Sequence, residues 1–78
     1  MKVELFKYTT ENIRYWMAEA DYANSCIRIL HGVHHGSLQE QIEEVELNNS
    51  GRDVEEQVNL RLKSRAKLKI DIGYRETI

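Results

Sequence analysis

The last third of the chain alternates apolar and basic residues, and this pattern constrains the fold more than any other stretch. From Val58 to Tyr74, apolar side chains occupy every even position except Ser64, and the odd positions from 61 to 69 are all basic. A period of two is typical of a half-buried strand. Because the stretch is too long for one strand, it predicts a hairpin over residues 58–74 that turns near Lys63-Ser64-Arg65.

The same stretch also has a helical interpretation. Apolar residues recur at steps of four, at Val54, Val58, Leu62 and Ala66. Acidic residues lie where the first turn would be and basic residues where the last would be, which suits the helix dipole. The alternative is therefore a helix over residues 53–66 followed by a strand. The long alternation, which includes Leu60, favours the hairpin, and residues 67–74 are a strand in both interpretations.

The first two thirds predict two strands and two helices. Residues 3–8 mix β-branched and aromatic side chains, and residues 26–30 are densely apolar, so both segments predict strands. Residues 10–24 predict an amphipathic helix from the spacing of Ile13, Trp16, Met17, Ala20 and Ala23. A second helix is predicted over residues 38–47, because Ser37 and Glu40 form a capping box ahead of Leu38, Ile42 and Val45. Residues 48–51 predict a turn.

These elements predict an α+β fold, a single small two-layer domain over residues 1–78. Its order is β-α-β-α followed by the C-terminal hairpin, with three to four strands and both helices on one face. A chain of 78 residues buries a small core. Cys26 is the only cysteine, so no internal disulfide can stabilise it, and we expect a homodimer. No apolar run exceeds four residues, which predicts no secretion signal or membrane span and a cytoplasmic protein.

Charge is sharply divided along the chain, although the formal net charge is only −2. Residues 37–60 carry seven acidic residues against one basic residue, so 1 − 7 = −6. Residues 61–78 carry six basic residues against two acidic ones, so 6 − 2 = +4. Segregated charge of this kind bears on partners and association.

The acidic residues predict a binding surface for a basic protein. On the predicted second helix, Glu40 and Glu44 would repel each other and Glu44 would oppose the helix dipole, so a positive partner is expected nearby. The favoured function is a non-catalytic regulatory protein that binds a basic protein. One form of this function is an inhibitor that mimics DNA and occupies the nucleic-acid-binding site of its target. The acidic block that would bind consists of Glu40, Glu43, Glu44, Glu46, Asp53, Glu55 and Glu56.

Two alternatives stay open. Direct nucleic-acid binding would use the predicted hairpin, whose aligned cations could neutralise about five phosphates, together with His31. This basic strip consists of Arg61, Lys63, Arg65, Lys67 and Lys69. The other alternative is a purely structural homodimer in which the acidic block of one subunit meets the basic strip of the other.

We predict a polar loop around the three histidines, His31, His34 and His35. We expect neither a metal site nor a catalytic site there. Zinc needs three or four convergent ligands, and adjacent histidines seldom point at one centre. If Cys26 were a nucleophile and His31 its general base, there would be no third residue to orient the histidine. We therefore expect no enzyme activity and no cofactor.

The segment Ile29-Leu30-His31-Gly32, followed after three residues by Gly36-Ser37-Leu38, resembles the signature loop of Smr domains. These are small α/β modules that bind, and in some cases nick, nucleic acid. The resemblance implies that His31, Gly32 and Gly36 lie near substrate. It covers about ten of the 78 residues, and the further glycine of Smr loops is replaced here by His34.

Overall fold

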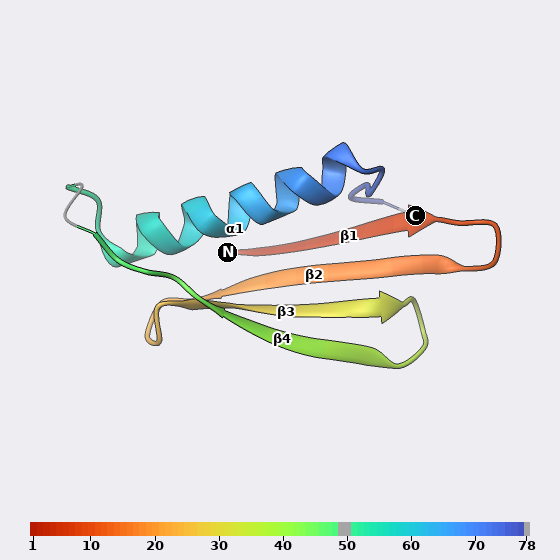
Figure 1. Ribbon diagram of the computed structural model, residues 1–78, viewed down its shortest axis with the longest axis horizontal. Coiled ribbons are helices and arrows are strands. Elements are labelled where there is room, and N and C mark those ends of the chain that lie inside the picture. Colours follow the sequence, from red (N-terminus) through yellow and green to blue (C-terminus); the bar gives the residue numbers. More distant parts are fainter. Residues whose placement is uncertain (49–50, 78) are drawn as a thin grey trace.

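Four strands come first in the chain, and a single long helix follows them (Figure 1). The structure is a computed structural model and describes residues 1–48 and 51–77. The strands are β1 (Lys2–Tyr8), β2 (Ile13–Asp21), β3 (Cys26–Val33) and β4 (Leu38–Glu44), and the helix is α1 (Val54–Asp71).

The strands form one antiparallel meander in the order β1-β2-β3-β4, so β1 and β4 are its edges. Leu5 pairs with Trp16, and Trp16 pairs with His31, so these three side chains share one face. Strand β3 requires glycine at Gly32, close to its turn into β4. There φ is +153°, and a Cβ would lie 2.6 Å from the carbonyl oxygen of Ser37.

Helix α1 covers one face of the sheet and supplies three buried residues to the core. Val58, Leu62 and Ala66 lie one turn apart on the helix and are buried. They belong to one cluster with sheet residues that include Leu5, Trp16, Ala18, Ile27 and Ile29. Full burial of an aliphatic side chain contributes about 1.5–3 kcal/mol, so this stripe holds the two layers together.

Both ends of α1 are fixed by local contacts. The side chain of Asp53 accepts a hydrogen bond of 2.8 Å from the backbone N–H of Glu56, which caps the first turn. After the helix, the chain returns to β1. Phe6 and Arg75 exchange two backbone hydrogen bonds of 2.7 Å, so the C-terminal segment pairs with the β1 edge there.

The predicted order β-α-β-α followed by a hairpin was wrong. Residues 10–24 contain strand β2 instead of a helix, and residues 38–47 contain strand β4 instead of a helix. Residues 58–74 do not form a hairpin, because most of them belong to α1. The predicted strand at 67–74 is wrong in both interpretations, although the alternative helix at 53–66 coincides with the first part of α1.

The physical reasons lie in where each element sits. Strand β2 is central and borders β1 and β3, so it shows a dense apolar run with no clear alternation. Helix α1 carries exposed apolar residues in addition to its buried stripe. Together the exposed and buried residues fill nearly every even position, which imitates the alternation of a strand. The predicted strands near residues 3–8 and 26–30 are present as β1 and β3. The predicted turn at 48–51 includes residues 49–50, which lie outside the described residues.

Candidate binding cleft and edge strand

A cleft of about 500 Å³ lies between α1 and β4. The helix packs against β1, β2 and β3 and has no close backbone contact with β4, so the β4 side of this face stays open. Trp16 and Ile29 form the floor of the cleft. Gln41 and Glu43 of β4 line one side, while Leu68 and Lys69 of α1 line the other.

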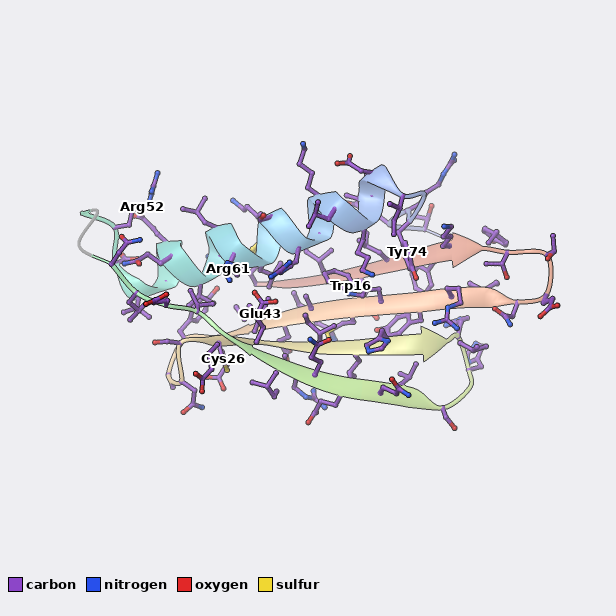
Figure 2. The ribbon with its side chains drawn as sticks, in the orientation of Figure 1. Trp16, Cys26, Glu43, Arg52, Arg61 and Tyr74 are labelled. Atoms are coloured by element: carbon purple, nitrogen blue, oxygen red, sulfur yellow. The ribbon has the colours of Figure 1, made fainter. Side chains whose placement is uncertain are left out.

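Glu43 connects the two walls of this cleft. It accepts a hydrogen bond of 2.9 Å from Nη1 of Arg61, and its other oxygen lies 2.9 Å from Nε of Arg65. Figure 2 shows Arg61 and Glu43 pointing toward each other from α1 and β4. The Glu43 side chain is 17% exposed. Its partial burial opposes ionisation, but the hydrogen bonds from Arg61 and Arg65 outweigh this and lower the pKa of Glu43.

The positive end of the cleft lies at the C-terminal half of α1. Nζ of Lys69 is 5.6 Å from the centroid of the buried Tyr74 ring, and Nζ of Lys7 is 5.9 Å from it. These distances fall within the range of cation–π attraction, so the ring holds both ammonium groups near one end of α1. Lys69 is also part of the cleft lining, as is His31 from β3.

The outer edge of β4 is unpaired along the described residues. Strand β4 is the last strand of the sheet, and all its residues except Glu43 are exposed. No described residue donates or accepts a backbone hydrogen bond along its outer side. Leu38 and Ile42 are 42% and 52% exposed, so the strand presents aliphatic side chains as well as carboxylates.

The acidic block does not form one surface. Glu40 pairs with Arg28 across the face opposite α1, Glu43 pairs with Arg61 and Arg65, and Asp53 caps the helix. The other four have no ion-pair partner among the described residues: Glu44, Glu46, Glu55 and Glu56. They lie at the end of β4, just after it and in the first turn of α1.

The basic strip lies on α1 and not on a strand face. Arg61, Arg65 and Lys69 follow at steps of four, so they share one side of the helix. Lys63 and Lys67 fall on other sides, and Lys67 lies 4.0 Å from Asp71. The five cations therefore do not form the single row that a hairpin would have given them.

The three histidines lie at two different places in the structure. His31 lines the cleft, whereas His34 packs edge-on against Phe6 at 5.2 Å on the face opposite α1. His35 stacks beside His34 at 3.9 Å. Among residues 1–48 and 51–77, no three His, Cys, Asp or Glu side chains are grouped so that they could hold a metal ion.

Cys26 is buried at the start of β3. Burial raises the pKa of its thiol, and the nearby carboxylate of Asp21 raises it further. A protonated, buried thiol is a poor nucleophile.

The cleft could not be predicted from the sequence, because the elements that form it were predicted wrongly. Trp16 was placed on a helix and Gln41 on another, so nothing brought them near Lys69. The one usable signal was the step of four from Arg61 to Arg65 within the alternative helix at 53–66, but both interpretations placed Lys69 on a strand.

Comparison with protein-family models, with curated proteins and with solved structures gave no match. The resemblance to Smr loops also fails in its geometry, because Leu38 opens strand β4 where an Smr loop would enter a helix. No helix of the described chain is both long and apolar enough to cross a membrane.

Proposed function

We propose that this chain is a non-catalytic binding domain that docks a basic, extended segment of a partner protein along the free edge of β4. The observation that carries this proposal is the contrast between the two edges. The C-terminal segment pairs with the outer side of β1 at Phe6 through Arg75, whereas the outer side of β4 has no strand beside it among the described residues. An exposed strand edge offers a row of backbone donors and acceptors to an added strand.

The side chains of β4 favour a basic partner. Glu40 and Glu44 lie on the face opposite α1, on either side of Ile42. An added strand that alternates basic and aliphatic residues would place its cations beside these carboxylates and its aliphatic groups beside Ile42 and Leu38. Cross-strand pairs of these kinds contribute roughly 0.2–1 kcal/mol each.

The same charges disfavour pairing between two β4 edges. In such a pair, the glutamates of one copy would lie close to those of the other, and like charges opposite each other are destabilising. Acidic residues on the edge therefore select against self-pairing while they leave the edge open to a cationic strand.

A regulatory role is part of this proposal. Segments rich in Lys and Arg commonly bind nucleic acid, and docking on β4 would occupy such a segment. The chain would then compete with nucleic acid for its partner, as an inhibitor does.

Selection of peptides from a random library on the immobilised protein tests the proposal. We expect the enriched peptides to alternate basic and aliphatic residues and to bind more weakly as salt rises. Glu44→Lys should lower their affinity at least fivefold. Glu55→Lys, which changes the charge equally on α1, is the matched control and should change affinity less than twofold. Enrichment of acidic peptides, or equal loss in both variants, would refute edge docking.

A further inference from the structure

The cleft between α1 and β4 has a charge opposite to that of the outer β4 edge. Its charged lining residues are Glu43, Arg65 and Lys69, which give 2 − 1 = +1. Arg61 shares the Glu43 carboxylate, and including it brings the local balance to +2. One carboxylate therefore faces three cations, and the cleft keeps an excess of positive charge.

Lys69 is the cation best placed for a ligand. Arg61 and Arg65 are already hydrogen-bonded to Glu43. No described carboxylate lies within ion-pair distance of Lys69, whose contact is the face of the Tyr74 ring. Cation–π attraction leaves the N–H donors of an ammonium free to bind an anion.

The rim of the cleft is apolar and exposed. Leu68 and Ile72 are 54% and 56% exposed although both line the cleft. A ligand with an aliphatic body would remove these side chains from water, and each Å² of apolar surface buried contributes about 25 cal/mol. The volume of about 500 Å³ is within the usual range of small-molecule sites.

From these features we infer that the cleft binds a small amphipathic anion, a carboxylate or a phosphate on an aliphatic chain. The anionic head would bind Lys69 and receive hydrogen bonds from the amide of Gln41. The aliphatic body would lie along Leu68 and Ile72. This site is separate from the outer edge of β4, so it does not depend on peptide docking there.

A matched set of eight-carbon probes tests the inference. Octanoate and octyl phosphate carry the two possible heads, octan-1-ol is the neutral analogue, and octylammonium is the cationic one. Trp16 is the only tryptophan and lines the cleft, so its fluorescence reports occupancy, and calorimetry gives the dissociation constant. We expect at least one anionic probe to bind about tenfold more tightly than octan-1-ol, and octylammonium to bind most weakly.

Variants of α1 locate the site. Lys69→Gln should weaken binding of the anionic probe about tenfold and leave octan-1-ol unchanged, whereas Lys69→Arg should retain binding. Lys63→Gln removes the same charge from a position outside the cleft and should have no effect. Equal binding of octan-1-ol and both anions would overturn the inference. So would equal losses in Lys69→Gln and Lys63→Gln, or no binding of either anion.

Discussion

Glu43 is the residue that joins the helix to the free side of the sheet. Its carboxylate is the shared partner of Arg61 and Arg65, and it lies in a strand that α1 does not otherwise touch closely. Removal of this carboxylate would leave two cations close together at the cleft wall.

Glu43→Gln should destabilise the protein by about 1–2 kcal/mol at neutral pH, since charge-assisted hydrogen bonds are lost at a mostly buried position. The pKa of Glu43 is lower in the folded chain than its ordinary value of 4.5. The unfolded state therefore binds more protons in this range, so the stabilisation is present above pH 4.5 and is lost as pH falls through the folded pKa.

Urea denaturation of both proteins from pH 7 to pH 3 measures this difference. The gap between wild type and Glu43→Gln should shrink below pH 4.5. Glu44→Gln, on the same strand but without an ion pair, should differ from wild type by less than about 0.5 kcal/mol throughout. A gap independent of pH would contradict the role given to the carboxylate.

Tyr15 provides a test on the opposite face of the sheet. Burial, and then the hydrogen bond of 2.6 Å that its hydroxyl donates to Glu4, raise the pKa of Tyr15 to about 12. Because the folded pKa exceeds the ordinary value of 10, the protonated phenol stabilises the fold below pH 10 and this contribution is lost as pH rises toward 12.

The difference in ultraviolet absorbance between wild type and Tyr15→Phe isolates this titration. We expect a midpoint near 12, and Glu4→Gln should lower it only in part, because burial is the larger cause. A midpoint near 10 in the wild type would contradict the burial of Tyr15 and its hydrogen bond to Glu4.

At the scale of elements, the burial of two leucines in α1 distinguishes the helix from the predicted hairpin over residues 58–74. In a hairpin, Leu60 and Leu62 would face the same side. In the helix, Leu62 is fully buried and Leu60 is 45% exposed. Leu62→Ala should therefore cost about 2–5 kcal/mol in the free energy of unfolding, and Leu60→Ala less than about 1 kcal/mol. Chemical denaturation measures both, and equal losses would contradict the helix.

Sequence patterns identified strands β1 and β3 but not strands β2 and β4. Strands β1 and β3 have short, dense apolar runs that admit one interpretation. In β2, Trp16 and Ala20 lie on the face toward α1, whereas Met17 lies on the opposite face. Because these apolar residues come from both faces of the strand, their spacing imitates the apolar stripe of a helix. In β4, Leu38 and Ile42 are four apart, which places them on one side of a strand as well as of a helix.

The helix was obscured by its own exposed residues. Its buried positions keep the step of four, but Leu60, Leu68 and Ile70 are apolar and exposed, and they fill the even positions between. Local spacing could not tell which apolar residues face a core, because that depends on where the sheet lies. The cleft could not be predicted from local spacing either, because it forms only where α1 packs over the sheet.

At the scale of the whole molecule, folding brings part of the divided charge together, because Glu43 pairs with Arg61 and Arg65, while Glu55 and Glu56 stay together in the first turn of α1. The structure is 45 Å long, and the start of α1 lies at the same end as the end of β4, with the C-terminal half of α1 toward the other (Figure 1). The screening length at physiological salt is about 8 Å, so a partner at one end senses that end and little of the other.

Self-association remains a prediction at this scale. A two-fold dimer would set the acidic end of one copy against the basic end of the other. Sedimentation should show a dimer at low salt that dissociates at high salt. A monomer at low salt and high protein concentration would contradict the predicted homodimer.

Hydrogen exchange measured with and without a selected basic peptide tests the edge-docking proposal most directly. An added strand would protect the outward-facing amides of residues 38–44, which have no backbone partner among the described residues, and we expect their exchange to slow at least tenfold on binding. Amides of β1 should be unchanged. Protection confined to β1 or α1, or binding with no change along β4, would contradict docking at this edge.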